Sequence, residues 1–323
     1  MAKVPSVKLS NGIDFPLLGL GTWQSSDKDE LFTALREAIK CGYRYIDTAY
    51  LYGNEALIGE FLQEIFKEGK LKREDIFITT KLPFYSHEPS RAEAAIKHQL
   101  ECLQTDYIDL YLMHNACGVQ PAEDGKSIRK DEKGQNVPDL TPYIDTWRVF
   151  ERFYKAGKFR AIGISNFNPQ QVQDLYDQAE IKPHNLQIEL HIYNRRTPLV
   201  ELCRKLDISI TSYATLGSPG RKAGFGPGDW PDADCLGHPL VQELAKKYNK
   251  TPAQILLRHM IQLNVSVIPK SINPARICQN FDVLDFKISD DDMKRFDTEV
   301  KETIRLFSFS FAKNHPRYPC FET

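Results

Sequence analysis

The chain has 323 residues, 41% hydrophobic and 26% charged, which is ordinary for a globular protein. A formal net charge of −1 argues against a nucleic acid or an anionic membrane as the main partner. No apolar run reaches the roughly 18 residues that a membrane span needs, and the N-terminus has no apolar segment of signal-peptide length. Seven cysteines without a C-x-x-C pair predict reduced thiols in the cytoplasm.

Strand and helix signals alternate along the sequence. A small hairpin is predicted around Asn11-Gly12, and apolar runs then alternate with amphipathic segments. Most of the runs are almost continuously apolar, as strands buried on both faces are. The predicted strands are Gly19–Trp23, Tyr43–Asp47, Ile76–Leu82, Ile108–His114, Arg160–Asn166, Leu186–His191, Ser209–Ala214 and Val265–Ser271.

Eight strand–helix units in one chain predict an α/β fold, a (β/α)8 TIM barrel with an N-terminal β-hairpin. No linker divides the sequence, so we expect a single barrel domain over residues 1–323. The long polar segment 115–140 is predicted to be a structureless lid or insertion. Gly217–Asp229 is predicted to be a flexible stretch, and Leu306–Thr323 an extended C-terminal loop with five aromatic residues.

Polar residues stand where the predicted strands end, and a barrel gathers all strand ends at one mouth. Each has a plain structural explanation by itself, since a strand-end Asp usually caps the next helix and a lone Lys is usually solvated. An Asp, a Tyr, a Lys and a His on successive strands are harder to explain in this way. The set comprises Asp47 with Tyr52, Lys81, His114, Ser165, Asn166, Gln187, Tyr213, Lys270 and Ser271.

This set suits the reduction of a carbonyl group. A Tyr with its ordinary pKa of about 10 is a poor acid near neutrality, and a neighbouring Lys81 ammonium is expected to lower that pKa. Asp47 can pair with Lys81, and His114 can donate a hydrogen bond to a substrate oxygen. The arrangement supplies a proton donor and an oxyanion site, while a hydride must come from a cofactor.

The nucleotide signals lie at the last predicted strand rather than in a glycine-rich loop. Gly19-Leu-Gly21 lacks the third glycine of the dinucleotide fingerprint. Lys270, Ser271, Asn273 and Arg276 stand at a strand end and helix start, where barrels bind phosphate, although a solvated helix start explains them equally well.

The stretch GYRYIDTAYLYGNEALIG, from Gly42 to Gly59, resembles the signature of the aldo-keto reductases. Further segments resemble that family along nearly the whole chain: GLGTW, ITTKL, GISNF, LQIELHIYN and VIPKS. The resemblance implies a reversible, NADPH-dependent reduction of aldehydes or ketones by a cytoplasmic, monomeric enzyme. No metal is expected.

The resemblance also implies roles for individual residues. Tyr52 would be the general acid, Asp47 and Lys81 would tune it, and His114 would orient the carbonyl group. Trp23, Tyr52, His114 and Asn115 would contact the substrate. The cofactor would lie along Gly21, Thr22, Trp23, Asp47, Ser165, Asn166, Gln187, Tyr213, Leu216, Ser218, Lys270, Ser271, Asn273, Arg276, Gln279 and Asn280.

The sequence departs from the family pattern around the substrate. The family often has Trp-Pro after its His, where this chain has Asn115-Ala116, and often has Trp where this chain has Pro83. Two aromatic walls of the substrate pocket are therefore missing, while Trp23 remains, and the pocket is expected to be roomier and more polar than in aldose-reductase-like members. Gln279 stands where many NADPH-specific relatives have Glu, and NADH is the less favoured alternative cofactor.

Two other interpretations stay open at this point. The first is an NADP(H)-binding structural or regulatory protein with weak or no turnover. The second is a barrel lyase or aldolase that uses Lys81 or Lys270 as a Schiff base.

Overall fold

The computed structural model describes residues 4–125, 127–221 and 231–318. Residues 222–229 of the predicted flexible stretch and Phe321 of the predicted C-terminal loop lie outside these ranges. None of the described helices is both long enough and apolar enough to cross a membrane.

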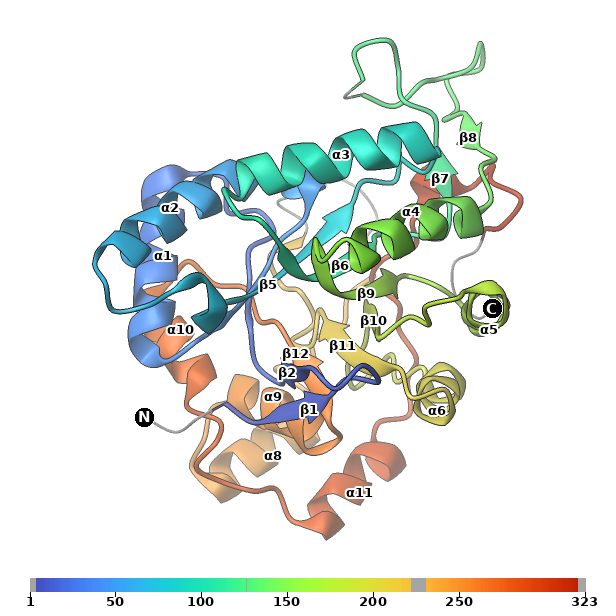
Figure 1. Cartoon of the computed structure of the whole chain (residues 1–323). Coiled ribbons are helices and arrows are strands. Elements are labelled where there is room, and N and C mark those ends of the chain that lie inside the picture. The colour runs from blue at the N-terminus through green and yellow to red at the C-terminus, as the bar shows by residue number, and fades with distance from the viewer. Residues whose placement is uncertain (1–3, 126, 222–230, 319–323) are drawn as a thin grey trace.

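Eight parallel strands form one sheet in the order β12-β11-β10-β9-β6-β5-β4-β3, with helices around it (Figure 1). The sheet closes on itself, because parallel bridges join Leu18 to Val267 and Gly21 to Lys270, and Gly19 N donates to Val267 O at 2.9 Å. This confirms the (β/α)8 barrel. The strands are β3 (Leu20–Gly21), β4 (Tyr45–Asp47), β5 (Phe77–Leu82), β6 (Ile108–Met113), β9 (Phe159–Ser165), β10 (Asn185–Glu189), β11 (Ser209–Tyr213) and β12 (Val265–Val267).

The helices begin and end at recognisable signals. The Asp27 side chain accepts a hydrogen bond from Glu30 N at the start of α1, and Gly42 ends that helix in the left-handed region, at φ 115°. The helices are α1 (Lys28–Cys41), α2 (Glu55–Lys67), α3 (Pro89–Cys102), α4 (Tyr143–Lys155), α5 (Pro169–Gln178), α6 (Thr197–Lys205), α8 (Pro239–Tyr248), α9 (Pro252–Gln262), α10 (Pro274–Phe281) and α11 (Asp290–Glu299).

The predicted hairpin closes the N-terminal end of the barrel. Strand β1 (Ser6–Lys8) pairs antiparallel with β2 (Asp14–Pro16). The fully buried Phe15 ring lies 5.4 Å from the Tyr45 ring and 5.3 Å from the Phe77 ring. These aromatic rings fill the barrel floor, so the polar strand ends gather at the opposite end.

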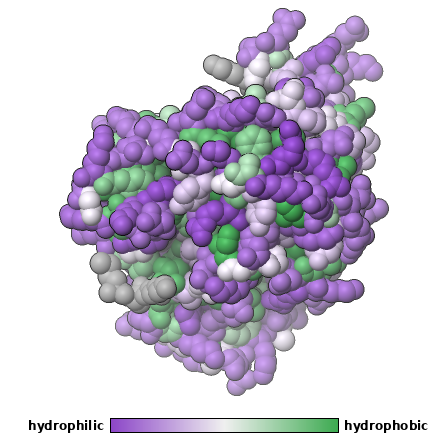
Figure 2. Space-filling model, in the orientation of Figure 1, coloured by the Kyte–Doolittle hydropathy of each residue, from purple (hydrophilic) through white to green (hydrophobic). Residues whose placement is uncertain are grey.

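The polar segment 115–140 is not structureless, and that prediction was wrong. Strand β7 (Gly118–Val119) pairs antiparallel with β8 (Pro138–Asp139), and bridges join Pro121 to Ile128 and Lys130 to Asn136. The segment projects from the barrel, and its surface is mainly hydrophilic (Figures 1 and 2). Backbone pairing between its two arms therefore gives the segment a defined structure.

The prediction that all cysteines are reduced thiols does not hold for two of them. Cys41 and Cys278, which are 237 positions apart in sequence, form a disulfide with their Cα atoms 5.6 Å apart. Among the described residues, Cys102, Cys117, Cys203 and Cys235 are not part of this disulfide. The prediction was wrong for this pair, because spacing in the sequence could not show that two distant helix positions meet.

Candidate active site

Four predicted residues meet at the C-terminal ends of the strands. Asp47 ends β4, Lys81 lies in β5, His114 follows β6, and Tyr52 ends the short 3-10 helix η1 (Tyr50–Tyr52). Lys81 Nζ lies 2.6 Å from Asp47 Oδ1 and 3.5 Å from Tyr52 Oη. The Tyr52 and His114 rings are 6.1 Å apart and nearly perpendicular. The structure thus brings the whole predicted set together.

The turn after β4 explains why Tyr52 faces the barrel mouth. Gly53 ends η1 in the left-handed region, at φ 65°, which favours glycine. Asn54 then fixes the turn from inside: Thr48 Oγ1 donates to Asn54 Oδ1 at 2.7 Å, and Asn54 Nδ2 donates to Thr22 O at 2.9 Å. This buried hydrogen-bonding accounts for the local sequence DTAYLYGN.

Asp47 and Lys81 form a buried ion pair, with 2% and 0% of their side chains exposed. Burial raises the pKa of Asp47 and lowers the pKa of Lys81, and the contact between the two charges opposes both shifts. Further bonds, from Lys81 Nζ to Thr48 O at 2.8 Å and from Gln187 Nε2 to Asp47 Oδ2 at 2.7 Å, hold the charged forms. A Schiff base needs an accessible amine, which Lys81 does not offer.

The pKa of Tyr52 does not follow the predicted direction. Burial, and then the negative charge of Asp47, hold the pKa of Tyr52 well above its usual value. The prediction that Lys81 lowers the pKa of Tyr52 was wrong, because the Asp47 carboxylate already neutralises the Lys81 ammonium. The phenol is therefore protonated at neutral pH, as a proton donor must be.

His114 is a neutral imidazole at physiological pH. Burial, and then the nearby Lys81 charge, hold the pKa of His114 well below its usual value. Its backbone oxygen accepts from Asn166 Nδ2 at 2.9 Å, and its Nδ1 has no hydrogen-bond partner within the described ranges. A neutral imidazole keeps one N–H for donation to a substrate oxygen.

Sequence reasoning missed a second buried carboxyl group behind Lys81. Thr80 Oγ1 donates to Glu55 Oε1, and Gln99 Nε2 donates to the same oxygen at 2.7 Å. Gln99 Nε2 also reaches Lys81 O at 3.2 Å, so this group supports the strand that carries the lysine. Burial raises the pKa of Glu55 to about 7. The signal was available, since Glu55 belongs to the motif around Tyr52.

The raised pKa of Glu55 predicts a specific loss of stability with pH. The folded protein holds a proton that the unfolded chain releases above pH 4.5, so this group favours folding at low pH, and that contribution is lost as the pH rises toward 7. The shift corresponds to a free energy on the order of 3 kcal/mol. Glu55→Gln should remove this loss, measured as the urea unfolding free energy at pH 5 and pH 8.

Glu60→Gln, on the exposed face of the same helix, is the matched control and should keep the wild-type dependence on pH. An unchanged pH dependence in Glu55→Gln would contradict the assignment.

The predicted nicotinamide-side residues are joined by hydrogen bonds. Asn166 adopts the left-handed region, at φ 59°, immediately after the strand that ends at Ser165. Its Nδ2 donates to Ser165 Oγ at 3.1 Å, and Tyr213 Oη donates to its Oδ1 at 2.8 Å. Gln187 Nε2 is committed to Asp47. The three strand ends β9, β10 and β11 therefore form one polar wall beside the Asp47–Lys81 ion pair.

The predicted phosphate-side residues lie at the start of α10. The Asn273 side chain caps the helix by accepting from Arg276 N at 3.0 Å, and Ser271 Oγ accepts from Asn273 N at 3.1 Å. The exposed Arg276 and Lys270 bring two cations to this helix start, which is the chemistry of a phosphate site. Gln279 is exposed and Asn280 is buried on the same helix.

A further cation lies beside the predicted pyrophosphate loop, and sequence reasoning missed it. Ser218, two residues after Leu216 in this loop, is half-buried, and its backbone lies in the left-handed region, at φ 46°. Arg221 is only 2% exposed and donates to Gly217 O at 3.2 Å. Its Nε and Nη2 have no partner within the described ranges. A buried guanidinium with donors to spare suits an anionic ligand.

The remaining N-terminal residues and the C-terminal segment meet near the polar wall. Thr22 Oγ1 donates to Asp47 O at 2.9 Å, which ties the end of β3 to β4. A Cβ at Gly21 would lie 2.6 Å from Ile268 O, so glycine there allows the close approach at which the barrel closes. The Phe307 ring lies 6.0 Å from the Trp23 ring and 5.5 Å from the Tyr213 ring. The C-terminal segment therefore contacts Trp23 and Tyr213 through Phe307.

Glu189, which sequence reasoning missed, anchors this segment. Its two carboxylate oxygens accept from Leu306 N at 2.7 Å and Phe307 N at 3.0 Å. His191 Nε2 lies 3.0 Å from the same carboxyl group. Because the carboxylate is buried in β10, it fixes the start of the C-terminal segment to the barrel.

The predicted substrate residue Asn115 is 1% exposed, and its Oδ1 accepts from Cys117 N at 2.9 Å. This geometry favours a role in the turn after β6. An aromatic pair does lie beside the end of β5, where the ring of Phe84 stacks on the ring of Phe311 from the C-terminal segment with their centroids 4.3 Å apart. Phe84 directly follows Pro83.

Two hollows of about 380 and 400 Å³ lie elsewhere, around the hairpin end of the barrel. Asp109 in the second hollow is paired with Arg160 at 2.8 Å and with Arg73 at 2.7 Å. The negative charge of Asp109 is therefore balanced by two arginines.

A barrel with this set of side chains at its strand ends defines a class of oxidoreductases, and the comparisons with known proteins agree. The model of the aldo/keto reductase family matches residues 17–301. The chain belongs to this family and is an oxidoreductase.

Individual relatives cover almost the whole chain. It is 41% identical to aldo-keto reductase family 1 member A1 of Gallus gallus, over 97% of this chain and 96% of that protein. It is 36% identical to estradiol 17 beta-dehydrogenase 5 of Mus musculus, over 99% of each chain. The aldose reductase structure from Schistosoma japonicum superimposes with a TM-score of 0.88 at 38% identity, covering 97% of this chain and 98% of that one.

Proposed function

We propose that this protein reduces aldehydes or ketones to alcohols with NADPH, with Tyr52 as the proton donor. The observation that carries the proposal is the position of Lys81 Nζ, 2.6 Å from the Asp47 carboxylate and 3.5 Å from the Tyr52 hydroxyl. Carbonyl reduction needs one proton on oxygen and one hydride on carbon. This arrangement supplies the proton from a defined atom.

The polarity of the site favours reduction. The neutral Tyr52 donates to the carbonyl oxygen, and the phenolate formed lies beside the Lys81 ammonium, which interacts more strongly with the anion than with the phenol. The neutral His114 orients the same oxygen through a hydrogen bond. Each interaction strengthens as negative charge develops, so each lowers the barrier rather than only the substrate Kd.

NADPH, when bound, would supply the hydride. Ser165, Asn166 and Gln187 would hold its carboxamide, and the ring of Tyr213 would stack on the nicotinamide. The pyrophosphate would lie by Leu216, Ser218 and the cationic Arg221. Lys270, Ser271, Asn273 and Arg276 would hold the 2′-phosphate, with Gln279 and Asn280 near the adenine.

Loss of the Arg276 side chain should weaken the binding of NADPH and leave the binding of NADH almost unchanged. A charge-assisted bond to the 2′-phosphate contributes about 1.5–3 kcal/mol, so Arg276→Ala should raise the Kd for NADPH about 10- to 100-fold. The Kd is measured by quenching of protein fluorescence with each cofactor. Lys97→Ala on α3, outside the barrel mouth, is the control for loss of a positive charge. An equal effect on both cofactors would contradict this role of Arg276.

The test of the function is oxidation of NADPH, followed by absorbance, over aromatic aldehydes, sugars, quinones and ketosteroids. NADH is run in parallel. We expect turnover with NADPH, in a protein that we expect to be monomeric and cytoplasmic. Tight NADPH binding without turnover of any carbonyl compound would overturn the proposal in favour of a binding protein.

A further inference from the structure

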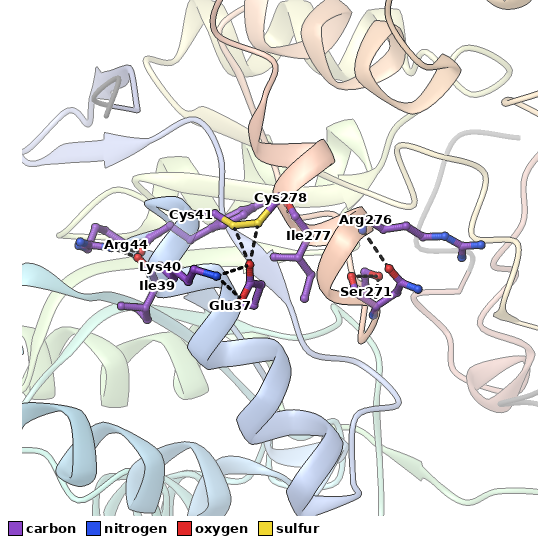
Figure 3. The surroundings of a disulfide bond; sticks show 11 residues. Glu37, Ile39, Lys40, Cys41, Arg44, Ser271, Arg276, Ile277 and Cys278 are labelled. Atoms are coloured by element: carbon purple, nitrogen blue, oxygen red, sulfur yellow. Dashed lines mark hydrogen bonds and ion pairs between the residues drawn. A yellow bond between two sulfur atoms is a disulfide. The ribbon is translucent and has the colours of Figure 1, made fainter.

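Cys41 and Cys278 lie where two helices of distant sequence meet. Cys41 is the last residue of α1, and Cys278 lies in the short helix α10. Their Cα atoms are 5.6 Å apart, within the range that a disulfide spans without backbone movement. Figure 3 shows the bond directly linking the two helices.

The surroundings also satisfy the reduced form of the pair. Glu37 Oε1 lies 3.8 Å from Cys41 Sγ and 3.2 Å from Cys278 Sγ, so each thiol has an acceptor. Glu37 itself lies 3.4 Å from Lys40 Nζ (Figure 3). Both cysteines are partly exposed, so small thiol reagents can reach them. Both sulfur atoms therefore lie beside the same carboxyl group.

The helix that the disulfide holds is the one proposed to bind the 2′-phosphate. Arg276 is two residues before Cys278 and extends away from the sulfur atoms in Figure 3. Asn273 caps the same helix, which has only eight residues. A constraint at Cys278 therefore acts within one turn of Arg276, which would contact the 2′-phosphate.

Noncovalent contacts already seat α10 on the end of α1. Tyr43 Oη donates to Ile277 O at 3.3 Å, and the Tyr43 and Phe281 rings are 5.0 Å apart. A Cβ at Gly42 would lie 2.7 Å from the Phe281 ring, so the two elements are in close contact there. The disulfide thus adds a covalent constraint to these noncovalent contacts between α10 and the end of α1.

We propose that Cys41 and Cys278 form a redox switch that sets the affinity for NADPH. This proposal rests on the proposed function. Closing the disulfide fixes α10 before the cofactor arrives, which reduces the ordering cost of binding. The oxidised protein therefore binds NADPH more tightly than the reduced protein, while the catalytic set, on other strands, is unchanged.

The oxidant is a small disulfide such as oxidised glutathione. One protein thiol, as its thiolate, attacks a sulfur of the small disulfide, forms a mixed disulfide and releases one small thiol. The second protein thiol then attacks the mixed disulfide and releases the other. In total, two protein thiols are oxidised, one small disulfide is reduced to two thiols, and their protons go to the released thiolates.

The experiment compares the full chain after equilibration with oxidised glutathione and after reduction with dithiothreitol that is then removed. Thiol titration in denaturant should give five thiols in the oxidised protein and seven in the reduced protein. The Kd for NADPH should be about 3- to 10-fold lower in the oxidised protein, the size expected from ordering one or two side chains in advance. The kcat should be the same in both.

Cys278→Ser should have the reduced-state Kd whichever reagent is used, and Cys102→Ser, on α3, should respond like the wild type. Equal thiol counts after both treatments, or an equal Kd with normal turnover, would overturn the switch alone. If NADPH binds in neither state, the proposed function fails together with the switch, and the thiol count still establishes the disulfide.

Discussion

Replacing Tyr52 by phenylalanine is expected to lower kcat for carbonyl reduction about 10²- to 10⁴-fold, the contribution of a positioned general acid. Phenylalanine keeps the ring that faces His114 and removes only the hydroxyl that lies 3.5 Å from Lys81 Nζ. The NADPH Kd should change little, because Tyr52 is not among the residues proposed to hold the cofactor. The measurement pairs steady-state kcat with the Kd from fluorescence quenching.

Tyr50→Phe is the matched control, because Tyr50 starts the same short helix and its ring packs on Tyr85 instead of on the catalytic set. It should keep kcat within about twofold, as expected for a residue outside the reaction. Wild-type turnover in Tyr52→Phe would show that the proton comes from another group, and the mechanism would then be wrong.

The parts of the site that follow from strand order could be predicted from the sequence. Asp47, Lys81 and His114 each stand at the end of an apolar run, and a closed parallel barrel brings such ends to one face. Tyr52 could be added because a glycine-bounded turn follows Asp47 directly. None of these inferences needs a contact between distant side chains to be known in advance.

The parts that depend on contacts between distant segments could not be predicted. The β7–β8 pairing, the Cys41–Cys278 bond and the anchoring of Leu306 by Glu189 all join residues that lack a local pattern. The pKa of Tyr52 was predicted in the wrong direction for a related reason. Its environment depends on how completely Asp47 neutralises Lys81, and a sequence does not show the burial that raises the pKa.

Replacing Lys81 by methionine should destabilise the protein as well as inactivate it. The substitution keeps the volume of the side chain but leaves the Asp47 carboxylate buried with only the Gln187 amide among the bonds described above. Breaking a buried ion pair from one side typically costs about 3–5 kcal/mol. The phenolate of Tyr52 would also lose the adjacent positive charge, so we expect kcat to fall at least about 10²-fold. Urea unfolding and steady-state kinetics measure the two effects.

The double variant Lys81→Met with Asp47→Asn separates the two causes. Removing both charges leaves no buried ion, so the double variant should be more stable than Lys81→Met alone, by roughly 1–3 kcal/mol of coupling between contacting residues. Its activity should stay low, because the ammonium beside Tyr52 is still missing. If the two substitutions are additive in stability, the pair does not act as a unit. If activity returns with stability, Lys81 serves the fold rather than the chemistry.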